Sequence, residues 1–434
     1  MSDNRLTEMI RKEAGFTLRI AFVHQPWSDV TPPVKRADSV ALWTDQVAHR
    51  LGKDNSVVCY SLRHPHHAES STFGGIEYRW IEPAHDRYLA KVGWKLDDLG
   101  LLPPEHSSFG SSWYYRHYGH RIADHLQSYG PDIVHVQNFS QFLPWIKRRN
   151  PRAKAVLHMH CDWLIELDRR WLEPRLAAAD AIVCCSGYYA NGIRKAWPGF
   201  ASRVHVVYNG VAPEEFAEIG EASPRPEESC RILFVGRVVP DKGVHILIEA
   251  FNGLVEEFPQ AELAIVGPLW DIRRSSPAIH ASKEAMVKEL EAKFGGASFE
   301  KCLRSHLTPA AAKRVTITGE ISRTELLARY RDSDLLVLPS ILPEGFGIPI
   351  VEAAYWGVPA VATRRGGLPE VIVDGQTGSL VEAGDTAGLR ATIADLLKDD
   401  ARRRRMGQAA RARTLELFTW DSTVHQLRRV YDNM

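Results

Sequence analysis

The feature that most constrains the fold of this chain is a repeated alternation of short apolar runs with stretches of helical periodicity. In the first half of the sequence, such runs cover residues 131–137, 153–160 and 179–186. A short apolar run closed by polar or turn-forming residues is typical of a strand buried on both faces of a parallel sheet. The alternation of such strands with helices therefore predicts a doubly wound α/β fold.

The same pattern begins near the amino terminus and returns in the second half of the chain. Further strands are predicted at residues 18–24, 55–61, 204–211, 231–237, 262–267, 315–321 and 334–340. Helices are predicted at residues 39–51 and 244–258, the first with Val40, Trp43, Val47 and Leu51 on one stripe. Each half of the sequence thus has its own set of strands and helices.

The length of the chain and one change in composition predict two domains. At 434 residues the chain exceeds what one hydrophobic core ordinarily holds. Residues 212–229 are rich in proline, glutamate and serine, which is typical of a linker. We expect the first domain at residues 16–212 and the second at residues 213–419.

A glycine loop between a strand and a helix is the strongest candidate for a ligand site. Gly345, Phe346 and Gly347 follow the apolar run at 334–340, and Pro349 suits the first turn of a following helix. Backbone N–H groups at such a helix start bind phosphate. Glu344 and Glu352 frame the loop, and carboxylates beside a phosphate site suit a ligand rich in hydroxyl groups, such as a sugar and a ribose.

A second candidate site element lies at the end of the strand at 231–237. A glycine turn there brings Arg237 and Lys242 close together. Two cations at a strand end can neutralise a diphosphate, because arginine offers a planar fork and lysine a movable point charge.

Two histidines mark the end of the strand at 153–160. His160 stands at the carboxyl end, where parallel sheets bind ligands, and His158 lies within the strand. Residues two apart share a face, so the pair could also bind a metal, but the other ligands of such a centre are missing. A hydrogen-bonded core position is the preferred interpretation for His158.

These motifs resemble the retaining glycosyltransferases of family 4, whose signature is two glutamates separated by seven residues with Gly-Phe-Gly between them. Glu344 and Glu352 match that signature, and the resemblance runs from about Leu18 to the end of the chain. It implies the GT-B architecture, in which two Rossmann-like domains face a central cleft and a last helix, here about residues 420–434, packs back on the first domain.

The resemblance also implies roles for individual residues. Arg237, Lys242 and the loop Gly345, Phe346 and Gly347 would hold the diphosphate, and Glu352 the ribose. Glu344 and His160 would contact the donor sugar, and the strand end at Ile321 would hold the base through backbone groups.

The sequence departs from the family pattern at two places. Pro32-Pro33 stands where many members have a glycine pair that contacts acceptor and phosphate, and Ala212 replaces an expected aspartate. Asp332-Ser-Asp334 looks like the metal motif of other glycosyltransferases, but it precedes a buried strand in a chain with a metal-independent signature, so we interpret it as capping.

Composition narrows the classes of partner. A net charge of +1 gives the protein no overall positive electrostatic field that would attract nucleic acid. No apolar run approaches the roughly 20 residues that a membrane helix needs. The polar, charged start of the sequence and the lack of such a run predict a cytoplasmic protein. Six scattered cysteines without a Cys-x-x-Cys pair favour reduced, structural thiols and indicate no zinc or redox site.

The predicted activity is transfer of a sugar from a nucleoside diphosphate sugar to an acceptor hydroxyl, with retention and without a metal or other cofactor. The resemblance implies a UDP-sugar as donor, because uridine diphosphate is the commonest carrier in the family, although GDP is also used. A nucleotide-sugar epimerase of the same fold and a non-catalytic nucleotide-sugar binding protein are the alternatives. Two segments stay open: the aromatic stretch at 64–117 could line an acceptor cleft or pack under loops, and residues 269–313 could be a lid, a partner surface or a solvated excursion.

Overall fold

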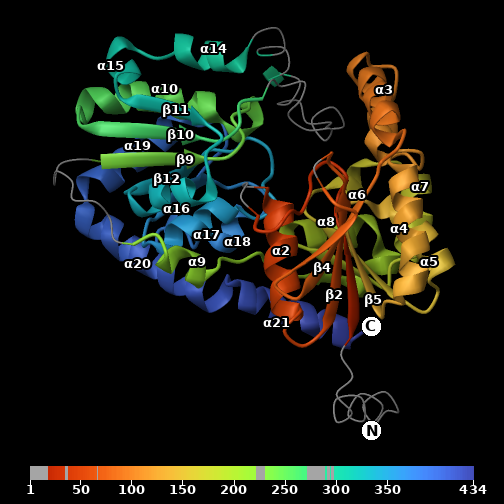
Figure 1. Cartoon of the computed structure of the whole chain (residues 1–434). Helices are drawn as coiled ribbons and strands as arrows, with labels where there is room; N and C mark the ends of the chain where they lie inside the picture. Colours follow the sequence, from red (N-terminus) through yellow and green to blue (C-terminus); the bar gives the residue numbers. More distant parts are fainter. Residues whose placement is uncertain are drawn as a thin grey trace.

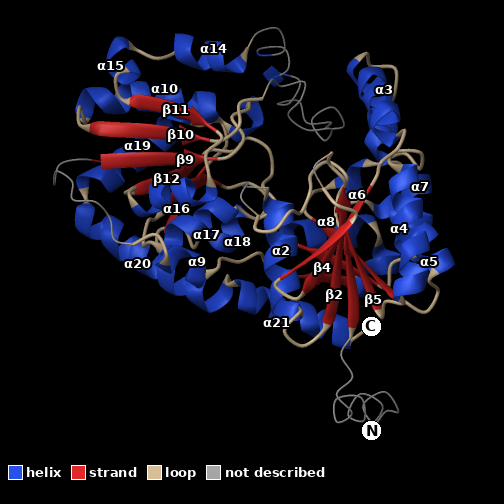
Figure 2. Ribbon diagram, in the orientation of Figure 1, coloured by secondary structure: helices blue, strands red, loops and turns tan. Residues whose placement is uncertain are grey.

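The computed structural model describes residues 18–34, 38–65, 67–220, 230–270, 289–290, 294 and 298–434. It contains two sheets, each covered by helices on both faces (Figures 1 and 2). The predicted α/β class with two parallel-sheet domains is confirmed. The predicted division between residues 212 and 213 falls between the last strand of the first sheet and the first strand of the second.

The first sheet has eight strands in the order β3-β4-β2-β1-β5-β6-β7-β8. All its neighbours pair in parallel except β3 and β4. Its strands are β1 (Arg19–Val23), β2 (Ser56–Leu62), β3 (Ser70–Phe73), β4 (Ile76–Ile81), β5 (Ile133–Gln137), β6 (Lys154–Met159), β7 (Ala181–Cys184) and β8 (Val204–Val206).

The second sheet has six strands, all parallel, in the order β11-β10-β9-β12-β13-β14. Its strands are β9 (Cys230–Val235), β10 (Ala261–Val266), β11 (Val315–Gly319), β12 (Leu335–Leu338), β13 (Ala360–Thr363) and β14 (Gly378–Val381). Buried residues make up all of the central strands β12 and β13, as the uninterrupted apolar runs predict.

Helices connect the strands and form the outer layers. In the first half they are α2 (Ser39–Leu51), α3 (Asp86–Asp98), α4 (Arg116–Tyr129), α5 (Leu143–Arg149), α6 (Trp163–Glu166), α7 (Arg169–Ala177), α8 (Gly187–Ala196) and α9 (Pro213–Ala217). In the second half they are α10 (Val244–Glu257), α14 (Phe299–Ser305), α15 (Pro309–Ala312), α16 (Arg323–Arg331), α17 (Ile348–Tyr355), α18 (Leu368–Val371), α19 (Thr386–Lys398), α20 (Asp400–Leu417) and α21 (Trp420–Asp432). Short 3-10 turns are η1 (Pro104–His106), η2 (Ser108–Gly110), η3 (Ser140–Phe142), η4 (Pro198–Arg203) and η5 (Pro240–Lys242).

The last helix, α21, belongs in space to the first sheet. In Figure 1 it lies beside α2, at the other end of the colour scale. Trp420 and Leu427 are buried in the same apolar cluster as Trp43 of α2, and Tyr431 Oη lies 2.8 Å from His135 Nδ1 on β5. The chain therefore ends by packing on the domain in which it began.

The aromatic stretch at 64–117 contains more regular structure than its weak periodicity indicates. It forms the β3–β4 hairpin and helix α3. Tyr114 and Tyr118 are fully buried, and Tyr118 Oη donates to the carbonyl oxygen of His24 at 3.1 Å. For these rings the packing interpretation is the one that the structure supports.

Two further expectations have different outcomes. Asn-Gly is a pair typical of a tight turn, which is the expectation for Asn209-Gly210, but no turn forms there. Instead, a Cβ on Gly210 would lie 2.3 Å from the carbonyl carbon of Thr419, because the segment leading into α21 crosses there. Residues 282–294, within the 269–313 segment, are charged with helical periodicity, which predicts a helix there. They lie largely outside the described residues, although Leu290 and Phe294 are described and buried.

Candidate active site

The glycine loop follows β12 and opens α17, as predicted. Gly347 has φ +96°, a conformation that favours glycine, and Pro349 occupies the first turn of the helix. Gly366 packs closely against the loop backbone, because an added Cβ there would lie 2.1 Å from the carbonyl oxygen of Glu344. Gly367 N–H donates to that same oxygen at 2.8 Å. The glycine pair at 366–367 thus supports the loop backbone from behind.

The two predicted cations lie beside this loop. Lys242 Nζ donates to Glu344 Oε1 at 2.6 Å, and Arg237 lies 3.7 Å from the carboxylate of Asp241. Gly243, with φ +69°, ends the η5 turn so close to the loop that a Cβ there would lie 1.9 Å from the carbonyl oxygen of Pro339. Only glycine fits this approach, so the basic turn and the glycine loop form one structural unit.

Glu344 is a carboxylate kept charged by its neighbours. Burial alone would raise its pKa, but the pKa lies below its usual value because Lys242, Ser340 and Arg237 favour the charged form. Ser340 Oγ donates to the same oxygen that accepts from Lys242. Both of these hydrogen bonds therefore go to one carboxylate oxygen of Glu344.

Glu352 has a partner that the sequence analysis missed. Arg323, at the start of α16, donates to Glu352 Oε1 at 2.5 Å and also to Glu215 Oε2 of the linker helix α9 at 3.1 Å. The Glu352 side chain is almost fully buried. The charges of Glu352 and Glu215 raise the pKa of Arg323, against the effect of its burial. Arg323 follows the capping residue Ser322 at the start of α16, and nothing in the local sequence indicates that its side chain contacts α17.

His160 follows β6, and its ring is held on the side of the first domain. Its Nε2 lies 2.8 Å from Gln137 Oε1, and its ring stacks on His158 with centroids 4.2 Å apart. Since an amide oxygen only accepts, Nε2 carries the proton. Burial lowers the pKa of His160 to about 3, so the ring is neutral and Nδ1 is an acceptor.

Two more residues that position His160 were missed. Asn138 Oδ1 accepts from the His160 backbone N–H at 2.8 Å, and Asn138 itself has φ +58°. Gln137 Nε2 lies 3.5 Å from the Thr44 hydroxyl. Both residues stand at the carboxyl end of β5, the neighbour of β6 in the sheet. Polar residues directly after an apolar run mark the sheet edge where ligands bind, and this signal could have found them.

His158 is a core residue, as expected. Its Nδ1 lies 3.1 Å from His135 Nε2, and its pKa is well below the usual value because it is buried. In the part of the chain that the structure describes, no group of three or more His, Cys, Asp or Glu side chains has the arrangement of a metal site. Asp334 Oδ2 accepts from the Arg231 backbone N–H at 2.8 Å, which supports a structural role for the Asp332-Ser-Asp334 segment.

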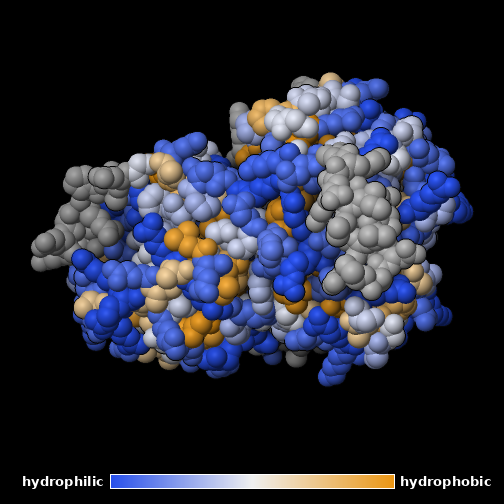
Figure 3. All heavy atoms as spheres, turned by 90° about the horizontal axis from the view of Figure 1, so that it is seen from below, coloured by the Kyte–Doolittle hydropathy of each residue, from blue (hydrophilic) through white to orange (hydrophobic). Residues whose placement is uncertain are grey.

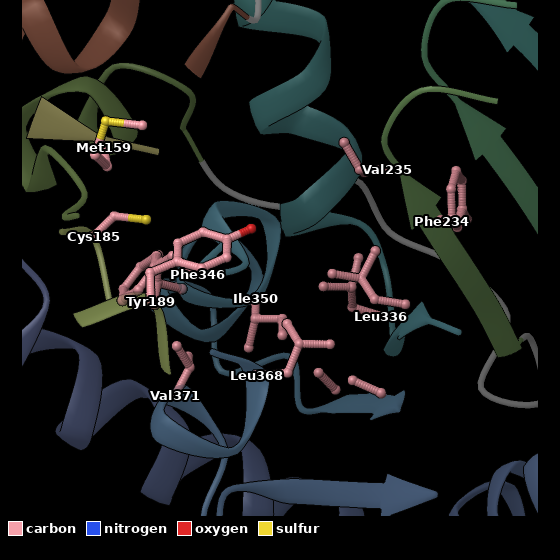
Figure 4. Close-up of a cluster of buried hydrophobic side chains, with 14 of the residues drawn as sticks. Met159, Cys185, Tyr189, Phe234, Val235, Leu336, Phe346, Ile350, Leu368 and Val371 are labelled. Carbon is pink, nitrogen blue, oxygen red and sulfur yellow. The ribbon is translucent and has the colours of Figure 1, made fainter. Parts of the chain in front are cut away.

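The two halves of the candidate site meet at Gly345. A Cβ there would lie 3.0 Å from the His160 carbonyl oxygen and 3.2 Å from the Tyr189 ring. Figure 4 shows a cluster of buried side chains that come from both domains, among them Tyr189 and Phe346. Glu370, from the second domain, accepts from the backbone N–H groups of Gly187 and Tyr188 at the start of α8, both at 2.7 Å. The structure therefore brings His160 and the glycine loop together, while Ile321 lies after β11 at the same carboxyl edge of the second sheet.

A cavity of about 340 Å³ lies elsewhere, at the amino ends of β9, β10 and β11. Its charged lining residues pair with one another, as Arg231 and Arg314 do with Glu262, both at 3.8 Å. It is opposite the edge that holds the glycine loop and is not a candidate active site. Among the described residues, no helix combines the length and apolarity needed to cross a membrane.

The fold and this site define a class: two parallel α/β domains with a glycine loop and a basic turn at the junction are the GT-B architecture. A model described as "Glycosyl transferases group 1" matches residues 215–413, and one described as "Glycosyltransferase Family 4" matches residues 48–215. The chain belongs to glycosyltransferase family 4.

Similar proteins agree with this assignment. D-inositol 3-phosphate glycosyltransferase of Corynebacterium efficiens is 36% identical over 373 residues, which cover 82% of this chain and 72% of that protein. Lipopolysaccharide 1,2-N-acetylglucosaminetransferase of Salmonella typhimurium is 25% identical, with 93% and 97% covered. Anabaena HepE, solved in complex with UDP and glucose, has a TM-score of 0.66 at 18% identity, with 96% and 100% covered, and so supports the fold.

Proposed function

We propose that this glycosyltransferase moves a sugar from a nucleoside diphosphate sugar, with uridine diphosphate as the first carrier to test, to an acceptor hydroxyl with retention of configuration. The observation that carries the proposal is the junction at Gly345. There the Lys242–Glu344 pair of the second domain meets the His160 strand end of the first. The complex of HepE with UDP and glucose supports UDP as carrier.

The diphosphate would lie between the basic turn and the glycine loop. Arg237 and Lys242 supply positive charge, and the backbone of Gly345, Phe346 and Gly347 supplies N–H donors at the start of α17. Positive charge placed before the reaction stabilises the diphosphate as it leaves, without reorganisation during the step. In this proposal these groups do what a metal ion does elsewhere, so turnover needs no metal or other cofactor.

The sugar and the ribose would be held by the two carboxylates and the histidine. Glu344 Oε2 and His160 Nδ1 are both acceptors that face ligand hydroxyl donors, and Glu352 accepts from the ribose. The loop after β11, around Ile321, would hold the base through its backbone. No carboxylate nucleophile is assigned: the departing diphosphate takes the proton of the acceptor hydroxyl on the same face, and the protein positions both reactants.

We also propose the cytoplasm as the compartment. Cys59, Cys161, Cys184, Cys185 and Cys302 carry free thiols, as in proteins of reducing compartments. This agrees with a donor made and used inside the cell.

The experiment is a screen of nucleotide-sugar donors against hydroxyl acceptors that follows release of the nucleoside diphosphate, with the anomeric configuration of the product read by NMR. Acceptor-dependent release with a retained configuration is expected. A changed donor sugar formed without any acceptor would instead show an epimerase. Binding of donor without either reaction, for all pairs, would show a non-catalytic binding protein.

A further inference from the structure

Helix α3 has an unusual surface. Six of the eleven large apolar side chains that are exposed among the described residues lie within residues 88–101. They are Tyr88, Leu89, Val92, Trp94, Leu99 and Leu101. Figure 1 shows α3 projecting from the first domain, whereas the face drawn in Figure 3 is largely hydrophilic with scattered apolar groups. A concentration of this kind marks an interaction surface.

The helix is divided into distinct faces. Tyr88, Val92 and Leu99 are separated by four and seven positions, so they lie on one side of the helix. Tyr88 is 70% exposed and Leu99 62%. Ala90 and Gly93 form the buried side, where a Cβ on Gly93 would lie 2.7 Å from Ser108 Cβ of η2. The apolar side therefore points away from the protein.

Positive charge lies on and beside the apolar side. Lys95, seven positions after Tyr88, is exposed on the same side as Tyr88 and Leu99, and Lys91, also exposed, lies next to that side. Two acids of the same helix make hydrogen bonds within the protein and so offset less of this charge at the surface. The carboxylate of Asp97 accepts from the Ser108 backbone N–H, and Asp86 is buried and accepts from the Tyr118 backbone N–H at 2.7 Å. Asp98 is the exposed acid of this helix.

We infer that α3 docks this enzyme on an anionic membrane surface. Leucine, valine and aromatic side chains next to lysines are what an interfacial helix buries at the boundary of headgroups and acyl chains. A second copy of the chain fits less well. A symmetric contact over this face would bring the lysines of both copies together.

The position of α3 connects this surface with the proposed function, on which this part of the inference rests. The helix follows β4, which runs parallel to β2, β1, β5 and β6, so α3 starts at the sheet edge where His160 lies. It packs on η2, whose Phe109 ring lies 4.8 Å from Trp163 at the start of α6. A membrane held at α3 presents headgroup hydroxyls on the side of the sheet edge that carries His160, which points to a lipid or a lipid-linked sugar as acceptor.

The test is co-sedimentation of the full chain with vesicles of phosphatidylcholine alone or with about one third phosphatidylglycerol. Binding is expected to the anionic vesicles and to weaken as salt screens the lysines. Tyr88→Ser with Leu99→Ser, and separately Lys91→Glu with Lys95→Glu, should each lower partitioning at least about tenfold. Leu415→Ser and Arg405→Glu, at exposed positions of α20, are the matched controls and should leave it unchanged.

Calorimetry with UDP keeps this inference separate from the proposed function. All these variants should bind UDP as the unchanged protein does, which also shows that they are folded. Absence of vesicle binding, or equal binding by the α3 variants, would overturn the inference. So would self-association in light scattering that the α3 variants abolish, because the face would then be an interface between copies of the chain.

Discussion

Lys242 Nζ donates a 2.6 Å hydrogen bond to Glu344 Oε1, which joins the basic turn after β9 to the glycine loop after β12. Both side chains are largely shielded from water. The lysine of the proposed diphosphate site and the glutamate of the proposed sugar site are thus one electrostatic unit, and neither can be changed without altering the other.

Lys242→Met is expected to weaken UDP binding and turnover together, because the diphosphate is bound before and during departure. It should also lower the melting temperature, since a largely buried carboxylate loses its cation, which typically costs roughly 3–5 kcal/mol. Calorimetry and thermal unfolding measure the two effects.

The control is Lys242→Met combined with Glu344→Gln, which removes both charges. It should recover part of the melting temperature but none of the UDP affinity. Recovery of both would mean that Lys242 acts only by neutralising the charge of Glu344 and does not itself bind the diphosphate.

His160→Ala is expected to reduce turnover far more than UDP affinity, because its contact is to the sugar in the reacting complex. Gln137→Leu removes the acceptor that fixes the proton on Nε2 of His160. It should lower turnover about tenfold or more with UDP affinity unchanged. Steady-state kinetics and calorimetry give the comparison.

The double variant decides whether Gln137 acts through the histidine. Gln137→Leu should cost little further turnover in the His160→Ala background. Independent, multiplying losses would mean that Gln137 has a different role.

Glu352→Ala should weaken UDP binding by about 1.5–3 kcal/mol, the range for hydrogen bonds to a charged group. Glu352 and Glu215 share Arg323, so Glu215→Ala is the matched control that disturbs the arginine without removing the ribose contact. Calorimetry should find the control close to the unchanged protein. Equal losses in both variants would assign the effect to Arg323.

Buried histidines should make the protein sensitive to acid. Burial lowers the pKa of His24 to about 4 and of His135 and His160 to about 3. In the unfolded chain the pKa of a histidine is about 6.5. Between that pH and the lower pKa of the folded state, the unfolded state binds more protons than the folded state, so the free energy of unfolding falls as the pH falls. Each histidine contributes up to about 1.4 kcal/mol per pH unit in that window.

Melting temperatures measured from pH 7 down to about pH 4.5 test this. His135→Gln should reduce the slope of melting temperature against pH, whereas His425→Gln, at an exposed position of α21, should leave it unchanged. A protein whose melting temperature is flat over this range would contradict the assignment of neutral buried histidines.

Turnover is expected to persist in excess chelator, because Arg237 and Lys242 supply the positive charge at the diphosphate. The measurement is release of nucleoside diphosphate with and without EDTA. Activity lost to EDTA and restored by magnesium or manganese would contradict this prediction.

The sequence by itself determined the elements that depend on local pattern. Helix α2 begins and ends at the predicted residues because Asp38 caps its first N–H groups and its apolar residues recur at helical spacing. The strands around the sites were predicted because buried parallel strands are uninterrupted apolar runs. Gly347 and Pro349 marked the loop and helix start because their backbone requirements are local.

The tertiary structure alone decided which side chains meet across long separations in sequence. Arg323 lies between Glu215 and Glu352, and Gln137 fixes the ring of His160, although neither pairing has a local pattern. Helix α3, within residues 64–117, was missed because it buries small residues and exposes large apolar ones, which reverses the usual pattern. The β3–β4 hairpin of the same stretch was missed as well. The physical reason is common to all three: partners set by packing leave no periodic trace in the chain, whereas helix caps, glycine turns and buried strands do.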